Sequence, residues 1–248
     1  MGKPVRVGIV GCPSDLGFEA VRKRFERIDW VDLDNHHEQA TRHSAELLPQ
    51  NVCSIIKRIV DNALSFDLQA ILFDEGYGKC DKARAVANLL ENRLDIPVLR
   101  TRNDNMEGRG TPLCDSNLPL LEKAEKILEG LTDTTPPPKL EPVNPPAALW
   151  GVPASDFELY KLFPDKTRLI GWFRCLENRT PADESLELSV DPDIPTVFFS
   201  QAFCHKNILA KDLAAQYNGL YVDMDGTLTS SVRAKVETFL RFNVKDMK

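Results

Sequence analysis

Apolar and polar positions alternate along the chain in short blocks that predict strands and helices in turn. Compact apolar runs of strand length occur at 5–11, 30–33, 71–73, 96–99, 148–152, 169–173, 197–199 and 220–222. Helices are expected between them, at 16–28, 36–48, 53–64, 118–131, 156–163 and 232–242, and also after residues 80 and 204. Because strands alternate with helices, we expect an α/β fold built from βαβ units with parallel sheets.

A proline-rich segment divides this pattern into two halves. Residues 132–146 contain six prolines and little apolar character, which is typical of an extended linker. We therefore expect two Rossmann-like domains, at 1–132 and 147–248, joined by a linker at 133–146. In this division the helix at 118–131 closes the first domain. In open sheets of this kind, binding sites form beyond the carboxyl ends of the strands.

Composition and charge narrow the functional classes. The chain has 248 residues, 42% hydrophobic residues and a formal net charge of −6, which is ordinary for an ordered protein. The acidic balance argues against nucleic acid as the main partner, since phosphate binding needs a basic surface. No apolar run is long enough to cross a membrane, and the amino terminus lacks the apolar core of a signal peptide. We therefore expect a cytoplasmic protein whose six cysteines are reduced thiols.

One unit occurs twice in the chain: a strand runs into a loop whose cysteine opens a helix. In the first copy Cys80-Asp81-Lys82 follows a predicted strand, and in the second copy Cys204-His205-Lys206 does so. Both copies therefore contain the pattern Cys-x-Lys. A further cysteine precedes each copy at a similar spacing, Cys53 in the first half and Cys175 in the second. This repetition points to chemistry at the strand ends.

The positions of the cysteines predict metal binding. Cys12, Cys80, Cys175 and Cys204 come just after predicted strands, and Cys53 opens a predicted helix. A thiol at a helix amino terminus is favoured as the thiolate, which is the form that ligates metals. The alternative is that these cysteines are buried small hydrophobic residues, but such residues would also fall in the middle of strands and helices. We therefore expect at least three of them to share a metal ion or cluster.

The spacing of the expected ligands along the chain indicates the kind of metal. The chain has no CxxC pair, so the usual zinc-ribbon and thioredoxin signatures are missing. Single cysteines from separate loops would converge at a cleft or domain interface, where three thiolates suit a [4Fe–4S] cluster with one open iron. Zinc stays open as a second possibility. Cys114 lies in a polar loop and is left out of the expected ligand set.

Three stretches resemble the 2-hydroxyacyl-CoA dehydratase superfamily, which comprises the dehydratase D-component subunits, the benzoyl-CoA reductases and the double-cubane cluster proteins. Residues 48–58, in which a Cys-Ser pair opens a helix, resemble the first family segment. Residues 70–73 followed by Cys80-Asp81 are similar to the family's strand that leads into Cys-Asp. The most specific stretch is 203–240, where a Phe-Cys turn precedes a strand and a helix similar to Arg-x-Arg-x-Glu-x-Phe, with Lys235 at the second arginine.

The resemblance implies a cluster site and a reaction class. By position, it implies that Cys53, Cys80 and Cys204 ligate a [4Fe–4S] cluster between two Rossmann-like domains, and that Cys12 and Cys175 would be needed as well for a double-cubane cluster. It implies low-potential one-electron chemistry in the dehydration or reduction of an activated substrate, with the electron supplied by an ATP-dependent activator protein. It also implies a dimer with itself or with a similar subunit. Family subunits are longer and carry helical insertions around an acyl-CoA pocket, so this chain is expected to keep the cluster site without that pocket.

Two other functions stay open. The first is a non-catalytic cluster carrier or electron-transfer partner. The second is a phosphatase of the haloacid-dehalogenase type, because Asp223-Met224-Asp225-Gly226-Thr227 matches that class's first motif, with the first aspartate as nucleophile and the second as acid or base. Its later motifs have no room in the one helix that follows, so a strand-ending turn with Thr229 or Ser230 capping that helix is favoured. Residues 8–13 faintly suggest a phosphate-binding turn but lack the dinucleotide spacing.

Overall fold

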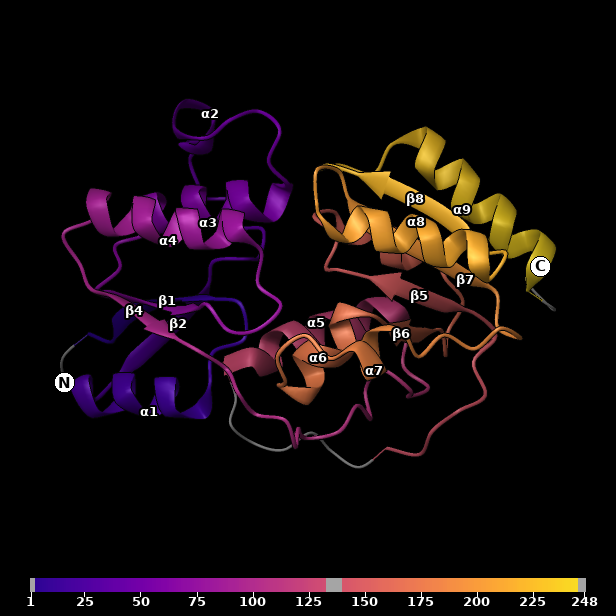
Figure 1. Ribbon diagram of the computed structural model, residues 1–248, viewed down its shortest axis with the longest axis horizontal. Helices are drawn as coiled ribbons and strands as arrows, with labels where there is room; N and C mark the ends of the chain where they lie inside the picture. The colour runs from indigo at the N-terminus through magenta and orange to yellow at the C-terminus, as the bar shows by residue number, and fades with distance from the viewer. Residues whose placement is uncertain (1–2, 133–139, 245–248) are drawn as a thin grey trace. The chain divides into compact units, whose positions relative to one another are not determined.

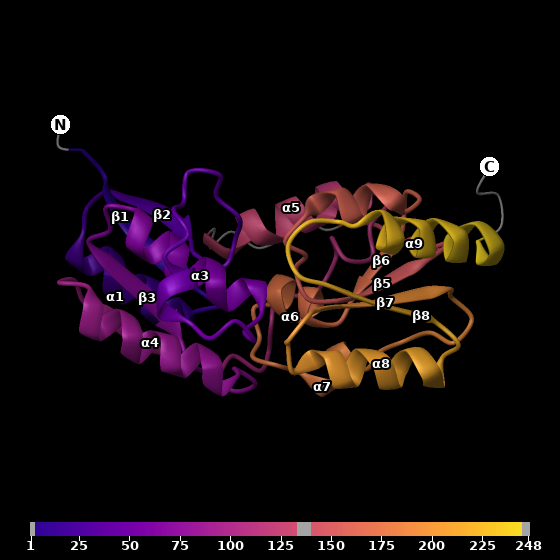
Figure 2. The same cartoon turned by 90° about the horizontal axis from the view of Figure 1, so that it is seen from above.

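The computed structural model describes residues 3–132 and 140–244, and the chain forms two compact units, Met1–Met106 and Glu107–Lys248. Each unit has its own four-stranded parallel sheet with helices on both faces (Figures 1 and 2). This confirms the expected α/β class with two Rossmann-like domains.

The first unit contains a parallel sheet in the order β2-β1-β3-β4. Its strands are β1 (Val5–Val10), β2 (Ile28–Asp32), β3 (Ala70–Asp74) and β4 (Val98–Thr101). Its helices are α1 (Asp15–Arg24), α2 (Ser44–Leu47), α3 (Ser54–Ser65) and α4 (Asp81–Arg93). Figure 1 shows α1 on one face of this sheet and α3 beside α4 on the other. The strand order changes direction between β1 and β3, so the ends of these two strands form the switch point at which such sheets usually bind ligands.

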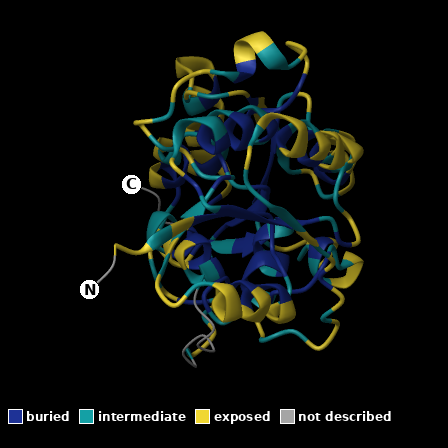
Figure 3. Cartoon of the chain, turned by 90° about the vertical axis from the view of Figure 1, so that its left-hand side faces the viewer, coloured by how far each residue is buried: buried dark blue, intermediate teal, exposed yellow. Residues whose placement is uncertain are grey.

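Buried apolar side chains fix these helices to the sheet. Phe18 and Val21 of α1 pack against Val7, Ile9 and Leu72 of the strands. All five residues of β3 are buried, which is typical of a central strand in a parallel sheet covered on both faces. Figure 3 shows buried strands at the centre and exposed residues on the outer surfaces of the helices.

The second unit repeats the topology of the first, with its sheet in the order β6-β5-β7-β8. Its strands are β5 (Ala148–Gly151), β6 (Arg168–Ile170), β7 (Thr196–Gln201) and β8 (Leu220–Met224). Its helices are α5 (Leu120–Glu129), α6 (Trp172–Asn178), α7 (Glu184–Glu187), α8 (Lys206–Gln216) and α9 (Ser230–Asn243), with 3₁₀ turns η1 (Gly130–Thr132) and η2 (Phe157–Leu162). Figure 2 shows α8 on one side of this sheet and α9 with α5 on the other. Strands β3 and β7 therefore occupy equivalent places in the two units.

Helix α5 belongs to the second unit, whereas the sequence pattern assigned it to the end of the first domain. It packs against α6 of the second unit. The Asn178 side-chain oxygen at the end of α6 accepts N–H groups from Arg109 and Gly110, at 2.9 and 2.6 Å. Arg179 donates to the carbonyl oxygens of Gly130 and Leu131 at the end of α5, at 2.7 and 2.8 Å. These bonds tie the segment that follows Met106 to the end of α6 in the second unit.

Two further expectations concern the linker and membrane-spanning helices. The first half of the expected linker, residues 133–139, lies outside the described residues. Within the described ranges, no helix has both the length and the apolar character that crossing a bilayer would require.

Candidate functional site

Cys53 and Cys80 occupy equivalent positions in the first unit. Each is the residue directly before a helix, with extended backbone angles: φ −69° and ψ 160° at Cys53 before α3, and φ −76° and ψ 153° at Cys80 before α4. The prediction that both cysteines open helices is therefore confirmed. In this position a side chain faces the N–H groups of the first helical turn, which have no intrahelical acceptor. The Cys53 side chain is buried, and the Cys80 side chain is half-buried.

The structure brings the Cys53 and Cys80 thiols into one electrostatic environment. Burial raises the pKa of Cys53, and the nearby Cys80 raises it further. The backbone N–H groups of Ile56 and Ile55 and the Lys82 ammonium act in the opposite direction and lower the Cys53 pKa.

Cys204 lies in the second unit, in the loop between β7 and α8. Its N–H donates to the Gln201 carbonyl oxygen at 3.1 Å, which closes a tight turn at the end of β7. Phe203 inside this turn has φ 62°, a left-handed conformation that is uncommon for a residue other than glycine, and its side chain is 54% exposed. Helix α8 is capped by His205, so Cys204 stands one residue before the cap. Cys204 is half-buried and follows its strand as predicted.

Cys12 and Cys175 differ from each other in their surroundings. Cys12 follows β1, as predicted, and its buried sulfur accepts a weak hydrogen bond from Asn103 Nδ2 at 3.8 Å. Cys175 was expected to follow a strand, and this is wrong: the strand ends at Ile170 and Cys175 lies within α6. Gly171, at φ 79°, lets the chain turn directly into the helix. Burial raises the pKa of Cys175 to about 12, so its thiol stays protonated at neutral pH.

The three cysteines of the expected ligand set are thus divided between the units. Cys53 and Cys80 both stand directly before helices of the first unit, and Cys204 lies at a strand end of the second. Within residues 3–132 and 140–244, no three His, Cys, Asp or Glu side chains form a group that could hold a metal ion.

A second cluster of polar groups, missed by the sequence analysis, lies where β1, β2 and β3 end. Asp34 Oδ2 accepts the Gly11 N–H at 2.7 Å, and Asp74 Oδ2 accepts the Cys12 N–H at 3.3 Å. Asp74 Oδ2 also pairs with Lys79 Nζ at 3.2 Å. The turn at 8–13 that suggested phosphate binding therefore already donates its N–H groups to the chain's own carboxylates. An aspartate directly after two of the three apolar runs, Asp34 after 30–33 and Asp74 after 71–73, was the signal for this arrangement.

For two carboxyl groups in this cluster, the ionised form is disfavoured relative to the protonated form. Burial, and next the adjacent Asp34, raise the pKa of Asp32 to about 8. Burial also raises the pKa of Asp34, while the positive charge of Lys79 acts against this. Among the described residues, neither Asp32 Oδ2 nor Asp34 Oδ1 has a hydrogen-bond partner, although both atoms are buried. A proton held by this pair would reduce the repulsion between the two groups.

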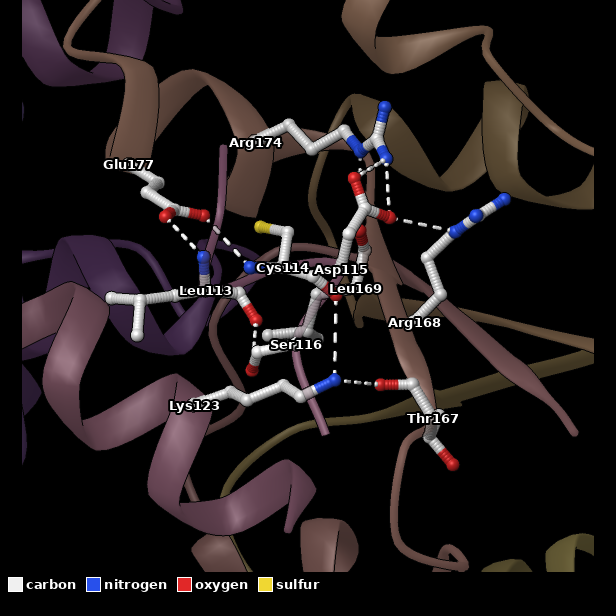
Figure 4. Close-up of polar contacts among 10 residues, drawn as sticks. All are labelled: Leu113, Cys114, Asp115, Ser116, Lys123, Thr167, Arg168, Leu169, Arg174 and Glu177. Atoms are coloured by element: carbon white, nitrogen blue, oxygen red, sulfur yellow. Dashed lines mark hydrogen bonds and ion pairs between the residues drawn. The ribbon is translucent and has the colours of Figure 1, made fainter. Parts of the chain in front are cut away.

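A third polar cluster, drawn in Figure 4, is built around Cys114 in the second unit. The Glu177 carboxylate accepts the N–H groups of Leu113 and Cys114 at 2.6 and 2.8 Å. Lys123 is fully buried and donates to the Cys114 and Thr167 carbonyl oxygens at 3.4 and 2.7 Å. Burial lowers the pKa of Lys123 to about 8 and raises the pKa of the Cys114 thiol.

An ion-pair group borders this cluster. Arg174 binds both carboxylate oxygens of Asp115, at 2.8 and 2.7 Å, and Arg168 Nε lies 2.7 Å from Asp115 Oδ1 (Figure 4). These contacts join the segment before α5 to β6 and α6. Because its hydrogen bonds and ion pairs connect these separate segments, the cluster has a structural role in the second unit.

The stretch that resembled a phosphatase motif lies on β8, at one edge of the second sheet. Asp223 and Asp225 are both exposed there. The Thr229 side chain accepts the Val232 N–H at 3.2 Å, so Thr229 caps α9, which is one of the two caps expected from the sequence. The stretch therefore ends a strand and begins the last helix.

No known family model matches the sequence, and no curated protein matches it significantly. The resemblance to the dehydratase superfamily thus rests on the three stretches of sequence that carry it.

Proposed function

We propose that the protein binds an iron–sulfur cluster through the thiolates of Cys53, Cys80 and Cys204, at the carboxyl ends of the strands. The observation that carries the proposal is that Cys53 and Cys80 stand at the starts of two helices that pack together, α3 and α4, where Cys80 raises the pKa of Cys53. Cys204 supports it as a half-buried thiol at the equivalent strand end of the second unit.

The donor set suits a [4Fe–4S] cluster. Thiolates are the ligands of such clusters, and the N–H groups at the starts of α3 and α4 are suitable donors to cluster sulfides. Three cysteines would leave one iron without a protein ligand. A double-cubane cluster would also need Cys12 and Cys175, and the burial of Cys175 inside α6 argues against that larger group.

The bound cluster would supply low-potential one-electron transfer. By its resemblance to the dehydratase superfamily, the proposed activity is the dehydration or reduction of an activated substrate such as a thioester, with the electron delivered by an ATP-dependent activator protein. The same resemblance supports assembly as a dimer with itself or with a similar subunit. This chain's own part is to hold the cluster and to set the charge around it.

Iron and acid-labile sulfide analysis after anaerobic purification tests the proposal. We expect both elements and a broad visible absorbance in the wild-type protein, and loss of bound iron in Cys53→Ala, Cys80→Ala and Cys204→Ala. Cys114→Ala is the matched control and should keep its iron, because Cys114 belongs to the buried cluster around Glu177. A wild-type protein without iron, or one that binds zinc alone, would overturn the proposal. Full iron retention in all three variants would refute the ligand assignment.

A further inference from the structure

In both units, the interior strand that leads to a candidate cysteine ends in a buried polar residue. Asp74 is the last residue of β3 and Gln201 is the last residue of β7, and these two strands occupy equivalent places in their sheets. Asp74 is 2% exposed and Gln201 is fully buried. Burying such side chains is unfavourable unless they form hydrogen bonds, so their partners indicate what they do.

In the first unit, Asp74 closes the loop that carries Cys80. Its Oδ1 accepts the Gly76 N–H at 2.8 Å, and its Oδ2 pairs with Lys79 Nζ at 3.2 Å. The Lys79 N–H in turn donates to the Gly76 carbonyl oxygen at 3.3 Å. One carboxylate therefore contacts the loop near both of its ends, and Lys79 directly precedes Cys80.

In the second unit, Gln201 closes the loop that carries Cys204. Its carbonyl oxygen accepts the Cys204 N–H at 3.1 Å. Its side-chain Nε2 donates to the Pro153 carbonyl oxygen at 2.7 Å. The Asn207 N–H donates to the Cys204 carbonyl oxygen at 3.1 Å, which continues the turn into α8. Cys204 is thus held by backbone bonds on both sides.

The two residues make the same connection with opposite hydrogen-bonding roles. Pro153 follows β5, the strand beside β7, and Cys12 follows β1, the strand beside β3. Gln201 donates to Pro153, whereas Asp74 Oδ2 accepts the Cys12 N–H at 3.3 Å. In each unit, the end of the interior strand therefore joins the cysteine loop to the loop of the adjacent strand.

We propose that Asp74 and Gln201 are positioning residues for Cys80 and Cys204, and that each holds in place the loop from which the thiol reaches its metal. Groups behind the ligands of a metal site fix the ligand geometry, and their loss weakens metal binding. This inference rests on the proposed function where it concerns iron. The effect on the two loops requires no cluster and is measurable in the metal-free protein.

The first measurement is the alkylation rate of each cysteine in the metal-free protein at one pH, read by peptide mass spectrometry. We expect Asp74→Asn and Lys79→Met to speed the alkylation of Cys80 by about fivefold, because one lost interaction of ordinary strength shifts a local opening equilibrium by about that factor. Both should leave Cys204 at its wild-type rate. Gln201→Met should speed Cys204 by a similar factor and leave Cys80 unchanged.

The two variants of the first unit separate position from charge. Asp74→Asn removes a negative charge and Lys79→Met removes a positive charge, so a purely electrostatic effect on Cys80 would have opposite signs in the two. Both variants break the same ion pair, so release of the loop speeds Cys80 in both. Opposite shifts would overturn the role of Asp74.

Each unit also offers a control substitution. Asp81→Asn removes an exposed carboxylate beside Cys80 that pairs with Arg84 at 3.8 Å, and it should change the Cys80 rate less than Asp74→Asn does. Gln216→Met removes an exposed amide at the end of α8 and should leave Cys204 at its wild-type rate.

The buried thiols report on the rest of the fold. Cys114 and Cys175 are both fully buried, and they should stay slow to react in every variant. Equal acceleration at all cysteines would show a general loss of stability and would overturn the inference. Wild-type rates at Cys80 and Cys204 in all three test variants would also overturn it.

The second measurement is the rate at which the loaded protein releases iron to a chelator. We expect Asp74→Asn and Gln201→Met to release iron roughly tenfold faster than the wild type. Asp81→Asn and Gln216→Met should release it at the wild-type rate. Release at the wild-type rate in both test variants would overturn the role of these residues at the cluster.

The two proposals fail in different ways. A wild-type protein that takes up no cluster, but in which each substitution speeds only its own cysteine, would refute the proposed function and support the role of Asp74 and Gln201 in the loops. A wild-type protein that takes up the cluster, with alkylation and iron release unchanged in the variants, would refute the positioning role alone. Circular dichroism of each variant confirms that the fold is intact before either comparison.

Discussion

Lys79 and Asp74 form an ion pair of 3.2 Å directly beside Gly11, at the point where β1 and β3 end. The Lys79 ammonium lies so close to the backbone that a Cβ atom at position 11 would be 2.7 Å from Nζ. Asp74 in turn accepts the N–H groups of Cys12 and Gly76, at 3.3 and 2.8 Å. The charged side chains of Lys79 and Asp74 therefore occupy the switch point of the first sheet, where β1 and β3 end.

This packing predicts the effect of Gly11→Ala. Gly11 has φ 77°, which strains any residue with a Cβ, and the added methyl would displace Lys79 from Asp74. We expect the first unit to lose about 2 kcal/mol of stability, measured by hydrogen exchange of its amides. Gly226→Ala is the matched control in the second unit, with φ 83° but nothing within 4 Å of the added Cβ. If the two substitutions lower the free energy of unfolding by the same amount, the contact with Lys79 adds nothing to the cost of Gly11→Ala.

The neighbouring Asp32 and Asp34 carboxyl groups predict a pH dependence of the first unit. Burial raises the pKa of Asp32 in the folded protein from 3.8 to about 8, so the folded state holds its proton more tightly than the unfolded chain. Stability therefore falls as the pH rises from about 4 to about 8, and this contribution is constant above that range. The charged groups around Asp32 are Asp34 and Arg58, and Asp34 is also influenced by Lys79 and Asp74.

Asp32→Asn tests this dependence. The amide cannot ionise, so the variant should be more stable than the wild type near pH 8, and its first unit should lose less stability between about pH 5 and pH 8. Chemical denaturation at several pH values measures both effects. Asp29→Asn removes an exposed carboxylate from the same strand, where it pairs with Arg6, and should keep the wild-type slope. An unchanged slope in Asp32→Asn would show that Asp32 does not carry the proton.

The fold class was predictable because its strands are buried on both faces. Runs such as those in β3 and β7 are apolar throughout, since helices cover both sides of a parallel sheet, and the turns between them are polar. The start of a helix at Cys53 and at Cys80 was predictable for a similar reason: an apolar helical stripe follows each cysteine. These features depend on residues close together in the sequence.

Features that depend on distant contacts were not predictable. Trp172 and Phe173 extend the apolar run of β6, so the pattern placed Cys175 after a longer strand, but the left-handed Gly171 ends that strand. The unit to which α5 belongs is decided by buried bonds of Lys123 and Glu177, and a buried lysine has no signature in the sequence. The bond from Lys82 to Asn51 likewise becomes visible only once α3 and α4 lie together.

In the second unit, we expect the largest loss of stability from removal of the Glu177 carboxylate. It is buried, and its two oxygens accept the N–H groups of Leu113 and Cys114 at 2.6 and 2.8 Å, which holds the segment before α5 against α6. Glu177→Ala would leave two buried donors without this acceptor, and we expect a loss of about 3 kcal/mol in urea unfolding of the second unit. Glu158→Ala removes an exposed carboxylate that pairs with Lys161, and should cost less than about 0.5 kcal/mol. A loss in Glu177→Ala no larger than in this control would mean that water replaces the carboxylate, and that the segment at 113–114 is held by its other contacts.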